Sequence, residues 1–156
     1  MKGKSWQVYV FSLLPLAAGL LVGLATGSRS QYAGLVKPPL SPPGALFPIV
    51  WTILYILMGL GFYLAWRGAE EKGLPAGRLL PPYILQLVCN LAWPLLFFFL
   101  RLYWFGSIWI LLLIPAVLWM MFRFWPASPA AKLQIPYLLW CYFATYLSFA
   151  TAALNP

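Results

Sequence analysis

Five long uncharged stretches dominate the pattern of hydrophobic and polar positions along the chain. They cover residues 5–28, 38–66, 79–100, 102–122 and 133–156, and each is 21 to 29 residues long. A helix needs about 20 apolar residues to cross the hydrocarbon core of a bilayer, because lipid offers no partners to backbone amides. The pattern therefore predicts one all-α integral membrane domain over residues 1–156, a five-transmembrane-helix bundle. The predicted spans are 6–26, 45–66, 79–100, 105–124 and 133–153.

The second uncharged stretch is longer than its helix because it begins with a proline-rich segment. Residues 38–44 read Pro-Pro-Leu-Ser-Pro-Pro-Gly, and such a sequence cannot form interior helical turns. Residues 27–44 are therefore expected to form a long, stiff loop between the first two spans. A loop of this length with fixed dihedral angles favours a role as a lid over part of the bundle.

Composition excludes a soluble single domain, a disordered chain and a disulfide scaffold. The chain is 63% hydrophobic and only 8% charged, with a mean hydropathy of +0.85. A soluble domain is about 25% charged, so this chain lacks the polar surface that a water-soluble globule needs. Cys89 and Cys141 both lie inside uncharged stretches, which favours small buried hydrophobes over a disulfide or a metal site.

The positive charges predict how the bundle lies in its membrane. The net charge is +8, but the basic residues stand singly at the ends of apolar stretches, which suits lipid headgroups and not nucleic acid. Seven of them fall on the side of the N-terminus and three on the other side. The positive-inside rule then predicts a multi-pass protein of a bacterial cytoplasmic membrane, with the N-terminus inside and the 27–44 loop outside.

The predicted spans contain no histidine and no acidic residue, which limits the mechanisms available to the protein. The chain has no histidine, and its only acidic residues, Glu70 and Glu71, lie in a loop beside Lys72. Proton-coupled transport, Ser–His proteolysis, haem ligation by histidine and a histidine metal site therefore have no residue to carry them. We expect no metal and no resident cofactor.

Aromatic and amide groups from three spans reach a similar depth. Trp51, Asn90 and Ala144 each lie roughly 17–20 Å from the inner boundary if the spans are straight helices, and Trp140 lies one turn from Ala144. A cavity with aromatic walls and few polar groups suits a flat hydrophobic ligand. Trp93, which follows Asn90 by three positions, is also a candidate ligand-binding residue, although packing in the core is the stronger interpretation of its position.

Three other patterns have structural interpretations. Gln86, one turn before Asn90, is as readily explained by a hydrogen bond to a neighbouring helix as by a site. The span-end tryptophans are predicted to anchor at the headgroup boundary; they are Trp6, Trp66, Trp104 and Trp125. Glycines at positions 19, 23 and 27 give the first span a smooth face, either for packing within the bundle or for a dimer contact.

Ordered motifs in the 27–44 loop and in the second, third and fifth predicted spans resemble one known family. They include Tyr32-Ala33-Gly34-Leu35, Ser41-Pro42-Pro43, Pro48-Ile49-Val50-Trp51-Thr52, Gln86-Leu87 with Asn90, Ala92-Trp93-Pro94, Pro136-Tyr137-Leu138 and Trp140 with Phe143-Ala144-Thr145. By this set the chain resembles the translocator protein or tryptophan-rich sensory protein family (TspO/MBR, also called peripheral benzodiazepine receptors), in a bacterial form.

The resemblance implies a membrane receptor or sensor that acts as a homodimer. Family ligands are porphyrins such as protoporphyrin IX, isoquinoline carboxamides and benzodiazepines. Carried over by position, Tyr32 would lie over the pocket, and Trp51 and Trp140 would form its walls. Asn90 would supply a polar contact, and the small side chain of Ala144 would determine how much space the pocket has. Light- and oxygen-dependent porphyrin degradation, known in some bacterial members, would make Trp51 and Trp140 catalytic.

Departures from the family pattern narrow these expectations. Leu40 stands where an aromatic residue is usual, and Ser148 replaces a common Asn. The C-terminal residues lack a Tyr followed by Arg or Lys, so cholesterol binding is not carried over. The main hypothesis is a receptor for flat hydrophobic ligands; a transporter of porphyrins or other lipophilic molecules and a porphyrin-degrading enzyme are the alternatives.

Overall fold

The computed structural model describes residues 5–156, apart from the side chains of Ser5 and Ser128. Lys2 and Lys4, which count toward the predicted orientation, lie outside the described residues. Five helices are long and apolar enough to span a membrane, and no strand occurs between residues 5 and 156. The prediction of an all-α membrane bundle with five spans is confirmed.

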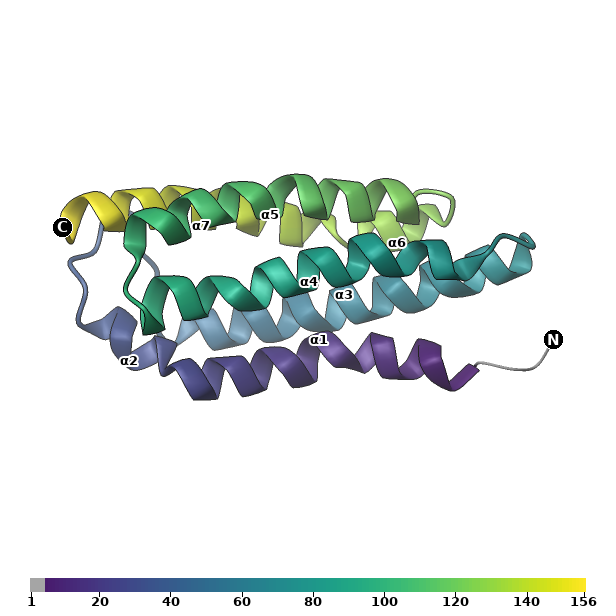
Figure 1. The fold of residues 1–156 in the computed structure, drawn as a ribbon, viewed down its shortest axis with the longest axis horizontal. Coiled ribbons are helices and arrows are strands. Elements are labelled where there is room, and N and C mark those ends of the chain that lie inside the picture. Colours follow the sequence, from purple (N-terminus) through teal and green to yellow (C-terminus); the bar gives the residue numbers. More distant parts are fainter. Residues whose placement is uncertain (1–4) are drawn as a thin grey trace.

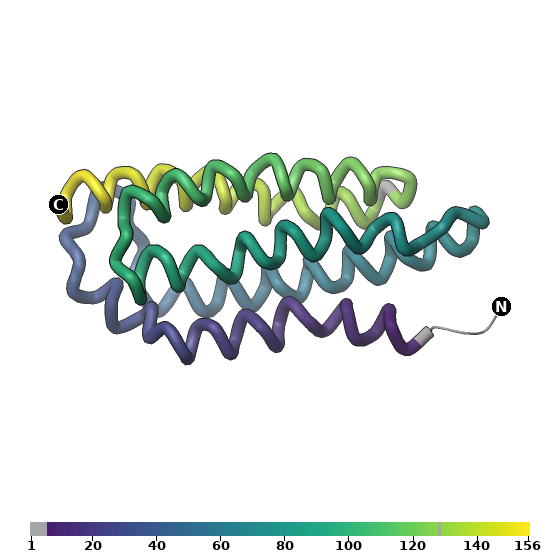
Figure 2. The backbone as a smooth tube through the Cα atoms, viewed as in Figure 1, coloured from purple at the N-terminus to yellow at the C-terminus, as the bar shows by residue number. Residues whose placement is uncertain are grey.

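The helices follow the chain in a simple order. The elements are α1 (Ser5–Thr26), α2 (Ser28–Ala33), α3 (Leu46–Glu71), η1 (Ala76–Leu79), α4 (Leu80–Pro94), η2 (Leu95–Phe99), α5 (Tyr103–Phe124), α6 (Ser128–Lys132) and α7 (Ile135–Leu154). In Figure 1 the long helices run along one axis, with α5 and α7 on one side, α1 on the other, and α3 and α4 between them. The tube in Figure 2 shows that α1 begins at the end of the bundle opposite to the end of α7, as an odd number of spans requires.

Each long helix of the bundle packs closely on only one or two others. Helix α1 packs on α3 and α4, α4 packs on α5, and α5 packs on α7. The backbones of α3 and α7 approach each other at few places. Aromatic side chains fill the wider space between them, where Trp51 contacts both Tyr137 and Trp140 edge to face.

Local details of the elements depart from the sequence prediction. The 27–44 loop contains the short helix α2, which begins after Gly27 in a left-handed conformation (φ 58°). The third span ends in a π-helical turn, Leu95–Phe99, directly after Pro94. Proline has no backbone N–H to bond the preceding turn, so the hydrogen-bond register is free to widen there.

The prediction that four tryptophans anchor at the headgroup boundary is wrong for one of them, Trp66. Trp6, Trp104 and Trp125 are more than half exposed, but Trp66 is buried and donates its indole N–H to Glu70 Oε1 at 3.0 Å. Glu70 also pairs with Arg67, so α3 continues five residues beyond its predicted end at Trp66. Charged residues in the last turn had suggested a loop, whereas their mutual pairing extends the helix.

Candidate functional site

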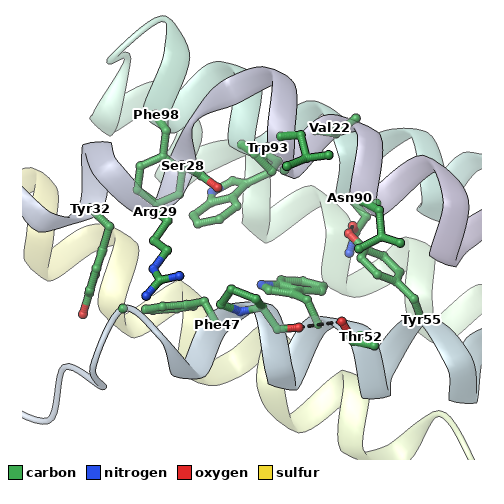
Figure 3. Close-up of a pocket in the computed structure, with 18 residues that line it drawn as sticks. Val22, Ser28, Arg29, Tyr32, Phe47, Thr52, Tyr55, Asn90, Trp93 and Phe98 are labelled. Atoms are coloured by element: carbon green, nitrogen blue, oxygen red, sulfur yellow. Dashed lines mark hydrogen bonds between the residues drawn. The ribbon is translucent and has the colours of Figure 1, made fainter.

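A cavity of about 320 Å³ lies beneath the 27–44 segment, between α1, α2, α3, α4 and η2. We call it the aromatic cavity because six aromatic residues line it: Tyr32, Phe47, Trp51, Tyr55, Trp93 and Phe98. Figure 3 shows the labelled members of this set, all but Trp51, around one space and on several elements. The volume falls at the lower end of the range for small-molecule sites. Leu20 and Leu24 also line the cavity and are 54% and 83% exposed, so it opens beside α1 on the outer surface of the bundle.

Helix α3 supplies one wall of the aromatic cavity as a row of three rings. Phe47, Trp51 and Tyr55 are spaced four residues apart and therefore share one helix face. Trp51 stacks on Tyr55 with 5.5 Å between ring centroids, and Phe47 meets Tyr32 edge to face at 4.8 Å. The row presents flat apolar surface from the lid to the middle of the bundle.

A buried chain of hydrogen bonds closes the inner end of the aromatic cavity. Tyr55 donates its hydroxyl hydrogen to Asn90 Oδ1 at 2.8 Å, and Asn90 Nδ2 donates to the Tyr137 hydroxyl at 2.8 Å. Tyr137 donates in turn to Gln86 Oε1 at 2.9 Å. These groups tie α3, α4 and α7 together and satisfy one another in a medium where unpaired polar groups are costly.

The lid is fixed across the mouth of the bundle by contacts with distant elements. Asn155, which follows α7, accepts from the Val36 backbone N–H and donates to the Val36 carbonyl, both at 2.9 Å. Tyr146 on α7 donates to the Pro39 carbonyl at 2.8 Å. The segment that begins after α1 is thereby attached to the far side of the bundle, which supports the interpretation of a lid.

Tyr32 attaches the lid to the aromatic row. Its ring packs on Phe47, and its hydroxyl donates to the Pro42 carbonyl at 2.7 Å. Burial raises the pKa of the Tyr32 hydroxyl above its ordinary value of 10.0, and a hydrogen bond with Ser41 opposes this shift. The hydroxyl therefore stays protonated and able to donate at neutral pH, and this contact is lost only as the pH rises through the raised pKa.

Two polar groups on residues of the aromatic cavity make no side-chain hydrogen bond among the described residues. Arg29 on α2 is an exposed residue that lines the cavity, and Figure 3 shows its guanidinium directed toward the space between Tyr32 and Phe47. Trp93 Nε1 is buried and has no hydrogen-bond partner among the described residues. The site therefore combines flat aromatic walls with a cation at the mouth.

The predicted site residues divide into two groups in the structure. Tyr32, Trp51, Asn90 and Trp93 line the aromatic cavity together. Trp140 does not line it but packs edge to face against the two lining residues Phe47 and Trp51, at 6.0 and 6.5 Å between centroids.

Ala144 is buried in the core cluster and is likewise absent from the cavity wall. Depth along a helix can be counted from sequence, whereas the direction in which α7 faces depends on packing. The ligand contacts predicted for Trp140 and Ala144 stay predictions.

Sequence reasoning missed several residues of the site. The spacing of Phe47, Trp51 and Tyr55 was a signal that could have found the α3 wall, since an aromatic row at intervals of four residues forms one helix face. Tyr137 was noted only as part of a motif. Arg29 was counted only as a charge at the end of a span.

The departures from the family pattern also have structural positions. Leu40 is 81% exposed and lies outside the aromatic cavity, with a φ of 65° at the third position of a turn from Pro38 to Ser41. This left-handed conformation strains a branched side chain. Ser148 is buried on α7, and its hydroxyl has no hydrogen-bond partner within residues 5–156.

Comparison with known proteins shows the family to which the sequence is similar. Residues 11–154 match the model of the TspO/MBR family. The chain is 34% identical to the translocator protein homolog of Schizosaccharomyces pombe, over 97% of this chain and 93% of that protein. It is 36% identical to the tryptophan-rich protein TspO of Archaeoglobus fulgidus, over 92% and 99% of the two chains. It is also 32% identical to the tryptophan-rich sensory protein of Cereibacter sphaeroides, over 95% and 85%.

Proposed function

The chain belongs to the TspO/MBR family of membrane proteins, and we propose that it is a receptor for porphyrins, protoporphyrin IX foremost, and for similar flat hydrophobic ligands. The observation that carries the proposal is the row of Phe47, Trp51 and Tyr55 along one wall of the aromatic cavity. A rigid planar ring would lie against these aromatic faces and lose little conformational entropy on binding. Isoquinoline carboxamides and benzodiazepines carry aromatic rings that would lie against the same faces.

The cation at the mouth favours a ligand with an acidic edge. Protoporphyrin IX carries two carboxylates on one side of an otherwise apolar ring, and Arg29 would pair with them while the ring lies inside. The opening beside α1 would let such a ligand pass in from the bilayer or from the headgroup region.

Titration of the purified protein with protoporphyrin IX and with its dimethyl ester tests this arrangement. We expect saturable quenching of tryptophan fluorescence by both compounds, with weaker binding of the ester. In the variant Arg29→Gln the two should bind equally, because the preference for the acid arises from Arg29. Equal binding of acid and ester by the unchanged protein would contradict the role of Arg29, and absence of saturable binding would contradict the receptor itself.

Porphyrin degradation is a second candidate function, supported by the oxidisable rings on the cavity wall. Trp51 contacts Tyr55, Tyr137 and Trp140, so an excited porphyrin in the cavity would lie beside a cluster of electron-rich side chains. Of the two proposed catalytic residues, Trp51 would touch the porphyrin, whereas Trp140 would act through Trp51.

Illumination in air separates a degrading enzyme from a receptor. We expect the unchanged protein to consume protoporphyrin IX with new product absorbance, and Trp51→Phe to slow this more than Trp140→Phe. The matched control is Trp125→Phe, at an exposed indole outside the aromatic cavity. If all three variants form the same products at the same rate, these indoles have no catalytic role.

Transport of porphyrins or other lipophilic molecules is the alternative within the same site. It requires release on the opposite side of the bundle, which the Tyr55–Asn90–Tyr137 chain closes. Uptake of protoporphyrin IX into proteoliposomes, compared with protein-free vesicles, distinguishes the two. A receptor gives no excess uptake, whereas a transporter gives uptake that depends on the protein.

A further inference from the structure

A second cavity lies at the other end of the bundle, where α3 ends and α4 begins. Its volume is about 310 Å³, and it is formed by the end of α3, the η1 turn and the end of α5. The η1 turn contacts both α3 and α5, so two consecutive segments of the chain and the distant end of α5 enclose it. We call it the interfacial cavity because these segments lie at span ends, where lipid headgroups meet the hydrocarbon core.

The interfacial cavity joins two arginines to an apolar wall. Arg78 comes from η1 and Arg123 from the last turn of α5, and both line the same space. Ala65, Ala69 and Leu79 supply apolar surface beside them. Guanidinium groups bind phosphate oxygens with fixed, bidentate geometry, whereas an apolar wall favours hydrocarbon.

The two arginines lack a counter-charge within the described part of the chain. Glu70 and Glu71 are the only acidic residues, and neither lines the interfacial cavity. Glu70 is already paired with Arg67. Lys72 does not line the cavity, but its ammonium donates to the backbone carbonyl of the lining residue Pro126. The cavity therefore carries unneutralised positive charge.

The rim of the interfacial cavity is apolar and open. Leu74, Phe122 and Trp125 line it while being 45%, 76% and 62% exposed. A soluble phosphate would gain nothing from this rim, but an acyl chain would lie against it. The charge and the apolar rim together match a molecule with a phosphate at one end and hydrocarbon at the other.

We propose that the interfacial cavity is a binding site for the phosphate headgroup of an anionic phospholipid, held by Arg78 and Arg123 with an acyl chain along the apolar rim. Such a lipid would fasten the ends of α3 and α5 to each other. This site is independent of the aromatic cavity, which lies toward the opposite end of the bundle and shares no lining residue with it.

Native mass spectrometry of the detergent-purified full chain tests the proposal with phosphatidylglycerol and phosphatidylcholine of the same acyl chains. We expect the first phosphatidylglycerol to bind about ten-fold more tightly than the first phosphatidylcholine, since two basic groups contact its headgroup. The variant Arg78→Gln/Arg123→Gln should lose this preference. The control Arg67→Gln/Lys132→Gln removes the same charge from residues outside the cavity and should keep it.

Two further results would overturn the proposal. If the control loses the preference as fully as the Arg78/Arg123 variant, the effect is general surface charge and not a site. If inorganic phosphate or glycerol 3-phosphate displaces phosphatidylglycerol at equal concentration, the site binds soluble anions and the lipid assignment is wrong. Protoporphyrin IX titration of the same variants should be unchanged, which separates this site from the proposed receptor function.

Discussion

Gly19 on α1 and Tyr55 on α3 form the contact that holds the end of the aromatic row in place. A β-carbon added at Gly19 would overlap the Tyr55 ring, which is also stacked on Trp51 and bonded to Asn90. The glycine face of α1 therefore serves packing within the bundle at this position. The sequence left open whether that face packs internally or forms a dimer contact, because spacing alone does not identify the partner.

Gly19→Ala should move Tyr55 and weaken the α1–α3 packing. We expect a loss of about 1–3 kcal/mol in the free energy of unfolding, as for other overpacked positions, together with weaker protoporphyrin IX binding. The control is Gly23→Ala, one turn further along the same cavity wall, where an added β-carbon meets no atom within 4 Å. Thermal unfolding in detergent should show a lower midpoint for the first variant only.

Asn90 acts mainly through the two tyrosines that it joins. Asn90→Leu keeps a similar volume but leaves the Tyr55 hydroxyl without its acceptor, while Tyr137 keeps its bond to Gln86. We expect a loss of about 1–2 kcal/mol, since an unmet buried donor is costly but bonds within membranes are individually modest. Adding Tyr55→Phe should restore part of this stability in a double-mutant cycle. Strictly additive effects would show that the hydrogen bond is not formed.

At the scale of elements, the lid is the part whose order depends on distant contacts. The proline-rich sequence predicted a stiff loop, but the anchors come from Asn155 and Tyr146, more than a hundred positions away. Helix α2 was not predicted, because a six-residue helix has too little periodicity to be recognised. The π-helical turn after Pro94 was not predicted either, because a proline in a span does not specify how the hydrogen-bond register changes after it.

Asn155→Ala should loosen the lid without unfolding the bundle. The substitution removes both hydrogen bonds to the Val36 backbone and leaves the α3–α4–α7 chain intact. Hydrogen–deuterium exchange followed by mass spectrometry should show faster exchange over residues 34–41 and no change in α4. Faster dissociation of protoporphyrin IX is the expected functional result. Equal exchange across the lid in both proteins would contradict the anchoring role of Asn155.

At the scale of the whole molecule, hydrophobic length alone was sufficient to predict the bundle. Five uncharged stretches gave five spans, because the bilayer fixes the length of a crossing helix. The family resemblance is also confirmed. The sequence does not show which side of each helix faces the bundle, because residues that face lipid and residues that face the core are equally apolar and the hydrophobic periodicity is weak. The sequence therefore predicted a similar depth for Trp51, Asn90 and Ala144, but not that Trp51 and Asn90 line the aromatic cavity and Ala144 does not.

The orientation predicted from charge is testable on intact cells. With the N-terminus inside, Leu40→Cys in the lid should react with a membrane-impermeant maleimide without permeabilisation. Glu71→Cys at the end of α3 should react only after the cells are permeabilised. The native Cys89 and Cys141 lie within the spans, so the unchanged protein is the control for background labelling. The reverse pattern would place the lid in the cytoplasm.

The central claim is that the aromatic cavity binds a flat hydrophobic ligand, and filling it is the most direct test. Gly23→Phe should place a ring in the open space at that wall without meeting other atoms at its β-carbon. Leu21→Phe adds a ring to the exposed face of the same helix and serves as the control. In a protoporphyrin IX titration followed by tryptophan fluorescence, we predict at least ten-fold weaker binding for Gly23→Phe and unchanged binding for Leu21→Phe. Equal, saturable binding by all three proteins would contradict the claim.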